Sequence, residues 1–386
     1  MAGRPRYFPS TFTWLRVGMG RSWRGVLGAL VGTWFYVPFA LAMSVLSAVV
    51  LGIVGFFGGF FFQQQHVPAA VTSLPLLGPA VEAFLPASGG VLGGLIGVLL
   101  GLLLGFTGAL AVFWVVVFSD DPVAGLGRLI GVAVAGLLVG VGYTLYRVMC
   151  ESMILRLSGA RRLSRREREL LLPIAQDCAR RLRLANFPPI LMDDSRQPSA
   201  IAYTRHIVLS RGLLEEFEYD REVIAGVLCH ELVHWRNGDP ISAAFVRGTA
   251  LPLYLAYAAA GWLSERGADR GHYRLASALA WLVLWPALLT VRFLIIPLQA
   301  IDARRAEYRA DQGAVLAGYR DGLRRALEQL LHSFESGRNG WDRAICAAHP
   351  PDEFRLERLE DTQHRYPFTE LDGPLPTPGG GSLRQD

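Results

Sequence analysis

Two histidines and the glutamate beside them form the most distinctive chemical pattern in the sequence. His230, Glu231 and His234 make an HExxH motif inside a predicted helix over residues 222–236. Histidines four residues apart lie on one helical face, so their ring nitrogens can converge on a single tetrahedral zinc ion. Glu231, one position on, can hold a water molecule at that ion and remove its proton as a general base. The motif therefore predicts a catalytic zinc site.

The alternative interpretation is a pair of surface histidines on a charged helix. The chain has eight histidines, and composition alone produces an HExxH motif with a chance on the order of 1%. Residues 223–229 are almost wholly apolar, which predicts a buried helix, and a buried histidine needs a polar partner. Both observations favour zinc binding.

A catalytic zinc ion takes three protein ligands and leaves one position open. The possible third ligands are His272, Glu307, His332 and His349. Glu307 and Asp311 lie one turn apart on a predicted helix, which suits a ligand carboxylate and a second carboxylate that accepts the outer N–H of a zinc histidine. They can equally be surface charges paired with Arg304 and Arg309, and the spacing alone leaves both interpretations open.

The elements that carry these residues belong to a membrane protein. Hydrophobic residues make up 52% of the 386 residues and charged residues 18%. From Gly25 to Ser119 the only Asp, Glu, Lys or Arg is Glu82, a pattern that no soluble domain of this length tolerates. The first apolar stretch, Val26–Phe62, is far longer than the apolar core of a signal peptide, which spans about 7–15 residues. The lipid bilayer is therefore the expected environment.

Five apolar stretches are long enough to cross a hydrocarbon core, which takes about 20 helical residues. They are Val26–Phe62, Val91–Phe118, Leu129–Met149, Ile241–Leu263 and Leu275–Ile296. The expected division of the chain is an N-terminal transmembrane region of two or three spans (1–150), a first part of a catalytic domain (151–240), a transmembrane hairpin (241–300), a second part of that domain (301–367) and a disordered tail (368–386).

Arginines flank the N-terminal region on both sides, before the first span and after the third. By the positive-inside rule both flanks belong in the cytoplasm, so we expect two true crossings plus one irregular segment, with an external N-terminus as the alternative. The net charge of +5 reflects these arginines and does not indicate nucleic-acid binding. We expect a multi-pass protein of the cell membrane with a cytoplasmic catalytic domain.

The soluble stretch after the third span has a mixed α and β pattern. Arg161–Leu184 is predicted to be a helix, and Pro189–Met192 and Ile207–Leu209 short strands. The helix that carries the HExxH motif ends at Asn237–Pro240, a run of strong helix breakers. The four cysteines are widely spaced and predict reduced core residues.

The second span carries glycines at positions 93, 97, 101 and 105, all on one helical face. Such spacing lets two helices approach closely in lipid. General glycine richness of this chain is an equally good explanation.

The HExxH motif and the pair Glu307 and Asp311 resemble the motifs of the HtpX and CAAX-prenyl-protease family of membrane gluzincins. In that family HExxH is followed by ExxxD, with a transmembrane hairpin between them. Glu307 and Asp311 match ExxxD, and Asp239 matches an acidic residue that follows HExxH. The resemblance implies a zincin-like α+β catalytic domain on a helical membrane anchor. It also implies that Glu307 is the third zinc ligand and that Asp311 and Asp239 support the site.

Two weaker matches extend the resemblance. His349, before two prolines, and Arg355 match a segment that lies beside the zinc site in such enzymes. It implies that His349 stabilises the oxyanion and that Arg355 braces the segment or contacts the oxyanion; without the resemblance, His349 is an ordinary turn residue. The family's substrate-binding edge strand corresponds to Ser199, Ala200, Ile201 and Ala202. Ser199 replaces the family's asparagine, but strand addition uses main-chain hydrogen bonds and tolerates that change.

The expected function is a zinc-dependent endopeptidase with one zinc ion per chain, acting on membrane or membrane-proximal polypeptides, including misfolded ones. A narrow processing protease of the CAAX-prenyl type is the alternative, and it requires a large enclosed chamber. A non-catalytic scaffold that retains zinc has no need of Glu231. A transporter or channel requires ionisable residues within its spans. The sequence leaves the substrate and the oligomeric state open.

Overall fold

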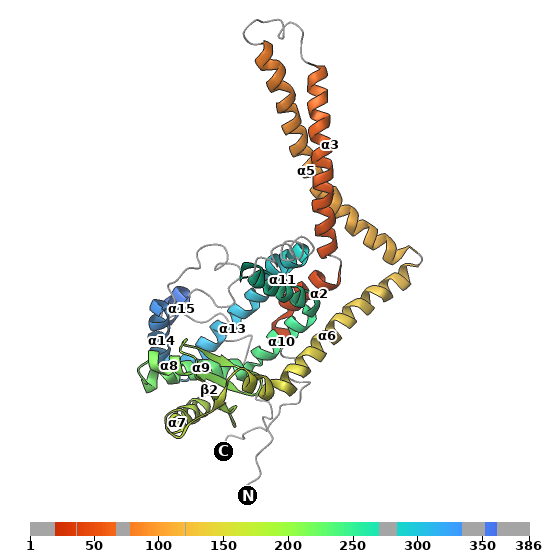
Figure 1. Cartoon of the computed structure of the whole chain (residues 1–386). Helices are drawn as coiled ribbons and strands as arrows, with labels where there is room; N and C mark the ends of the chain where they lie inside the picture. The colour runs from red at the N-terminus through yellow and green to blue at the C-terminus, as the bar shows by residue number, and fades with distance from the viewer. Residues whose placement is uncertain are drawn as a thin grey trace. The chain divides into compact units, whose positions relative to one another are not determined.

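The computed structural model describes residues 20–35, 37–66, 78–119, 121–269, 284–333 and 352–360 (Figure 1). The chain divides into two compact units. One comprises Met1–Ala29, Leu137–Leu251 and Arg292–Asp386, and the other Leu30–Gly136 and Pro252–Val291. The first unit contains the HExxH and ExxxD motifs, and the second contains a long apolar hairpin.

Within the described ranges, four helices are long and apolar enough to cross a membrane. They are Val37–Gln65, Phe84–Phe118, Pro122–Leu157 and Leu284–Leu316. Three of the four precede the HExxH motif in the chain, and the fourth contains the ExxxD motif. The prediction of a membrane-embedded helical protein is therefore confirmed at the level of helix length and composition.

The first apolar stretch is not one helix, as expected for Val26–Phe62, but two. Helix α2 spans Trp23–Trp34 and helix α3 spans Val37–Gln65. Pro38 stands in the first turn of α3, a position that proline favours because its missing N–H has no helical acceptor there. With 12 residues, α2 is about 18 Å long, too short to cross a bilayer, so the first candidate span begins at Val37.

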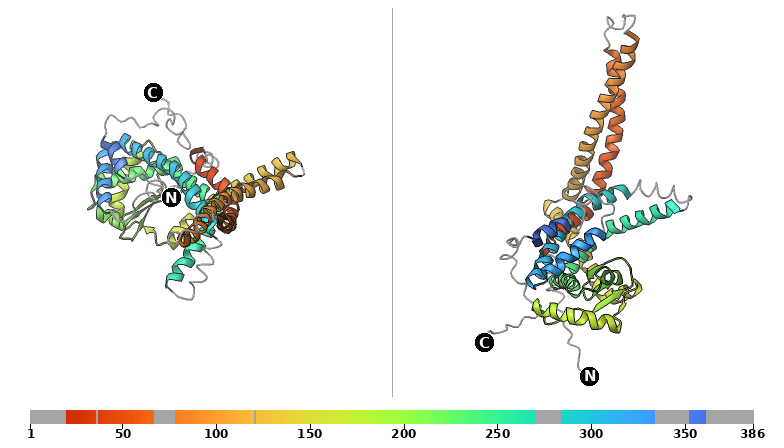
Figure 2. Two further views of the ribbon diagram at one scale, coloured as in Figure 1. Left: turned by 90° about the horizontal axis from the view of Figure 1, so that it is seen from above. Right: turned by 90° about the vertical axis from the view of Figure 1, so that its left-hand side faces the viewer.

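Helices α3 and α5 (Gly78–Phe118) pack against each other as an antiparallel hairpin, and glycines lie at their contact. The two helices run side by side in Figures 1 and 2. A Cβ atom added at Gly93 would lie 2.1 Å from the carbonyl oxygen of Gly55, and one added at Gly97 would lie 2.0 Å from that of Leu51. The structure thus supports the packing interpretation of the glycine-rich face.

The stretch Ile241–Leu263, expected to be one arm of a transmembrane hairpin, falls in two helices. Helix α10 is Asp239–Thr249 and helix α11 is Leu251–Asp269. Neither is among the candidate spans of the described residues, and Phe245 and Val246 of α10 are buried within the first unit. Of the other expected arm, Leu275–Ile296, the described part (284–296) belongs to the candidate span Leu284–Leu316, so the hairpin itself stays a prediction.

Four short strands form the sheet of the first unit, in the order β1-β2-β4-β3. The strands are β1 Arg161–Arg162, β2 Ile190–Asp193, β3 Ala200–Ala202 and β4 Ile207–Ser210. Strands β2 and β4 are parallel, while β1 and β3 are antiparallel to their neighbours. Among the described strands, β3 therefore lies at an edge of the sheet, with one side that pairs with none of them.

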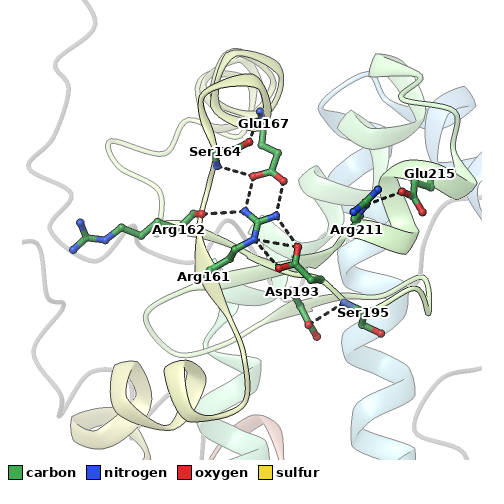
Figure 3. Close-up of polar contacts among 9 residues, drawn as sticks. Arg161, Arg162, Ser164, Glu167, Asp193, Ser195, Arg211 and Glu215 are labelled. Atoms are coloured by element: carbon green, nitrogen blue, oxygen red, sulfur yellow. Dashed lines mark hydrogen bonds and ion pairs between the residues drawn. The ribbon is translucent and has the colours of Figure 1, made fainter.

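Helix α7 begins at Arg165, four residues later than predicted, because Ser164 and Glu167 form a capping box. Arg161 instead pairs in the sheet, and its guanidinium binds Glu167 at 2.8 and 2.9 Å (Figure 3). It also binds Asp194, at 2.7 Å. The hydrogen bonds from Arg161 hold the pKa of Glu167 at about 2, below its ordinary value. This cluster ties the start of α7 to the sheet.

The core of the first unit surrounds helix α9, Arg221–Asn237. Every residue from Val223 to Val233 is buried. The helix packs against α7 (Arg165–Arg181), α13 (Ile296–Leu316) and α14 (Arg320–Ser333). The predicted buried helix is confirmed. It ends where Gly238 adopts the left-handed conformation, after which Pro240 stands in the first turn of α10.

Candidate metal centre

Helices α9 and α13 bring three potential ligands together. His230, His234 and Glu307 each offer one atom, and these atoms lie within 4.8 Å of one another. The two histidine Nε2 atoms are 3.0 Å apart. Glu307 Oε2 lies 3.4 Å from Nε2 of His230, and Oε1 lies 3.5 Å from Nε2 of His234. Two nitrogens and a carboxylate thus face a common point.

The outer nitrogen of each histidine faces a carboxylate. His230 Nδ1 is 2.9 Å from Asp311 Oδ1, and His234 Nδ1 is 2.8 Å from Asp239 Oδ2. A neutral imidazole that donates from Nδ1 carries its lone pair on Nε2. Two such lone pairs at 3.0 Å repel each other unless a cation lies between them. Two histidines, one carboxylate and an open position are a common ligand set of catalytic zinc, so the residues present fit this ion.

The charges around the site also favour a cation. Burial lowers the pKa of His234, but the negative charges of Glu307 and Asp239 outweigh burial and place that pKa well above its ordinary value. The same holds for His230, where hydrogen bonds to Asp311 and Glu307 overcome the effect of burial and raise the pKa. A field that attracts a proton to these rings equally attracts a metal ion.

Arg355, on the short helix α15 (Asp352–Glu360), buttresses the carboxylates. Its guanidinium donates to Asp311 at 2.6 and 2.9 Å and lies 3.5 Å from Glu307 Oε2. The side chain is 7% exposed, and bidentate pairs of this kind fix geometry as well as adding energy. Arg355 was predicted either to brace its segment or to contact the oxyanion, and these contacts support the bracing role.

Glu231 points into a cavity of about 350 Å³ that His234, Glu307 and strand β3 also line. Its Oε2 accepts a hydrogen bond from the backbone N–H of Ala202 at 2.6 Å. Burial raises the pKa of Glu231 above its ordinary value, although the Ala202 hydrogen bond opposes the shift. A raised pKa moves the carboxylate toward the range that suits a general base near neutrality.

The predicted substrate-binding segment lies where the free edge of β3 meets this cavity. Ala200, Ile201 and Ala202 all line it. Ser199 continues the pairing beyond the strand: its N–H donates to Ser210 Oγ and its carbonyl accepts from the Ser210 N–H, both at 2.8 Å. The backbone of Ser199, not its side chain, makes these contacts.

Some predicted residues are not placed. His349, expected to act on the oxyanion, lies outside the described residues. The same is true of His272 and of the side chain of His332, which were alternatives for the third ligand.

The cavity also contains residues that the sequence did not identify. Arg21 and Ser22 line it, although the N-terminal arginines were interpreted only as a topology signal. Arg309 lines it as well and lies 3.7 Å from Asp239. Asp302 accepts hydrogen bonds from Gly25 N at 3.1 Å and from an N-terminal arginine. No local pattern predicts contacts between segments that lie so far apart in the chain.

Comparison with known proteins identifies related sequences. The family model described as Peptidase family M48 matches residues 165–363. A "Protease HtpX homolog" of Aquifex aeolicus is 27% identical over 264 residues, covering 60% of this chain and 83% of the relative. One from Salinibacter ruber is 28% identical over 291 residues, covering 67% and 98%. One from Dictyoglomus thermophilum is 27% identical over 269 residues, covering 63% and 86%.

Proposed function

The chain belongs to peptidase family M48, and from that premise we propose that it is a membrane-bound endopeptidase for membrane or membrane-proximal polypeptides, including misfolded ones. His230, His234 and Glu307 hold the zinc ion in this proposal, and Glu231 is the general base. The observation that carries it is the cavity in which His234, Glu307, Glu231 and an unpaired strand edge meet.

A zinc ion bound there supplies Lewis acidity, which polarises a peptide carbonyl and lowers the pKa of a water molecule. Glu231 takes the proton from the water molecule that attacks the carbonyl carbon. It then delivers this proton to the nitrogen as the carbon–nitrogen bond breaks, leaving a free amine and a carboxylate. Ala202 N–H, 2.6 Å from Glu231 Oε2, holds the carboxylate in place. His349 is proposed to donate to the oxyanion.

Strand β3 binds the substrate backbone in this account. Its outer edge pairs with no other strand in the described part of the chain, and an extended polypeptide can add to such an edge through main-chain hydrogen bonds. Ile201 is 45% exposed and lines the cavity. A binding mode that uses the main chain suits unfolded polypeptides of varied sequence.

The position of Glu307 supports a site close to the membrane surface. It is the 24th residue of the helix Leu284–Leu316, and about 20 helical residues cross a hydrocarbon core. A hydrocarbon core is about 30 Å thick. If Leu284 stands near one face, Glu307 emerges just beyond the other, which we assign to the cytoplasm.

Substituting Glu231 tests the proposal. Glu231→Gln should retain zinc and lower kcat/KM for an unfolded membrane-protein substrate by about a thousandfold, within the range for loss of a general base. Glu222→Gln is the matched control, because Glu222 lies on the same helix and its side chain is 54% exposed. Full cleavage by the Glu231 variant would remove the proposed base.

A further inference from the structure

Helix α6, Pro122–Leu157, carries a single carboxylate, Glu151. The helix is one of the candidate membrane spans, and Glu151 is only 4% exposed. A buried ionisable group is costly unless it is paired. The partners of Glu151 therefore indicate what this residue does.

Among the described residues, the hydrogen-bond partners of Glu151 come from the turn that joins β3 to β4. Glu151 accepts from the backbone N–H of Thr204 at 2.9 Å, from that of Arg205 at 2.8 Å, and from the Thr204 hydroxyl. His206 Nδ1 lies 2.9 Å from Glu151 Oε1, the oxygen that also accepts from Arg205. One carboxylate thus binds three consecutive residues of the turn and fixes their backbone.

The same turn is joined to the helix that carries the HExxH motif. Trp235 Nε1 donates to the carbonyl oxygen of Thr204 at 3.2 Å, and Trp235 follows His234 directly on α9. On the strand side, the turn begins right after Ala202, whose N–H donates to Glu231. Strand β3 has three residues and one paired side, so its ladder alone gives it little rigidity.

We propose that Glu151 is a positioning residue for peptide hydrolysis. It holds the β3–β4 turn so that the free edge of β3 stays aligned with Glu231 and presents its main chain to the substrate. This inference rests on the proposed function, because the edge matters only if a polypeptide binds to it. A displaced edge loses main-chain hydrogen bonds to the substrate, which weakens the binding of a peptide long enough to lie along it.

The test compares Glu151→Ala and Glu151→Gln with Glu169→Gln in full-length, zinc-loaded protein. Glu169 is the control, since its side chain is 63% exposed on α7. The substrates are an internally quenched peptide long enough to lie along β3 and a truncated form that cannot reach it. Amide hydrogen exchange of residues 200–206 gives a readout that needs no activity.

For Glu151→Ala we expect faster exchange in residues 200–206 but not in residues 223–233 of α9. We also expect KM for the long peptide to rise about tenfold while its kcat changes less than about threefold. The value of kcat/KM for the truncated peptide should likewise change less than about threefold. Glu151→Gln should lie between the alanine variant and wild type, since its amide oxygen can still accept from the turn. Zinc content should not change.

Unchanged exchange and unchanged KM in the alanine variant would overturn the proposal. So would an equal loss on both peptides with faster exchange throughout α9, because Glu151 would then only stabilise the fold. Wild-type protein that cleaves neither peptide would contradict the proposed function itself, a result distinct from either of these.

Discussion

Replacing Asp239 with asparagine should weaken zinc binding while leaving the fold intact. Asp239 Oδ2 is 2.8 Å from Nδ1 of His234, so its charge fixes the tautomer that presents the Nε2 lone pair. Losing such a partner lowers metal affinity about 10- to 100-fold, or about 1.4–2.7 kcal/mol. Its other charged contact, Arg309, lies 3.7 Å away, so little stability depends on it.

Asp311→Asn should behave differently, although it faces the other histidine in the same way. Asp311 is 1% exposed and also receives two hydrogen bonds from Arg355. Removing the carboxylate charge breaks the buried ion pair with Arg355, and breaking such a pair costs about 3–5 kcal/mol. This variant should therefore lose zinc affinity and also stability of the metal-free protein.

The two effects can be measured separately. Competition with a fluorescent zinc chelator gives the affinity, and thermal unfolding in excess EDTA gives the stability without the contribution of bound zinc. We expect Asp239→Asn to lower only the zinc affinity, and Asp311→Asn to lower both the zinc affinity and the stability of the metal-free protein. Zinc affinity of Asp239→Asn within about threefold of wild type would refute the role assigned to the carboxylate.

Three further outcomes are expected. The pKa of Glu167 falls from 4.5 to about 2 on folding, so its charge stabilises the fold above pH 4.5, and this contribution disappears as the pH falls toward 2. Glu167→Gln should thus lower the free energy of unfolding by roughly 1 kcal/mol at pH 7 and reduce the loss of stability on acidification. Thermal unfolding with EDTA at several pH values measures this, and an unchanged pH profile would contradict the ion pair. Gly93→Leu should destabilise the α3–α5 hairpin, whereas Gly58→Leu should not, because a Cβ atom at Gly58 meets nothing within 4 Å; equal melting temperatures in detergent would refute the glycine contact. Chelation of wild-type protein should lower its melting temperature by an amount that depends on zinc concentration, and a chelator-independent transition would contradict zinc binding to the folded state.

Local spacing made part of the site predictable from the sequence. His230 and His234, and likewise Glu307 and Asp311, are four residues apart, and helix geometry alone places such pairs on one face. Their meeting across two helices was expected from the family resemblance rather than from spacing. The apolar run before His230 also predicted correctly that α9 is buried.

Contacts between distant segments were not predictable in this way. Glu151 and Thr204 lie in different elements, and the short polar turn gives no signal of its partner. Asp302 and Gly25 are separated by most of the chain. Hydropathy also merged α2 with α3, because it measures apolar content and not where Pro38 allows a helix to begin.

The zinc content of purified wild-type and Glu307→Ala protein tests the central claim most directly. The account predicts about one zinc ion per wild-type chain, held by three protein ligands, and a large loss of zinc in the variant under the same dialysis. Asp321→Ala, in the first turn of α14, serves as the control and should keep its zinc. Equal zinc content and affinity in wild type and Glu307→Ala would contradict the three-residue site.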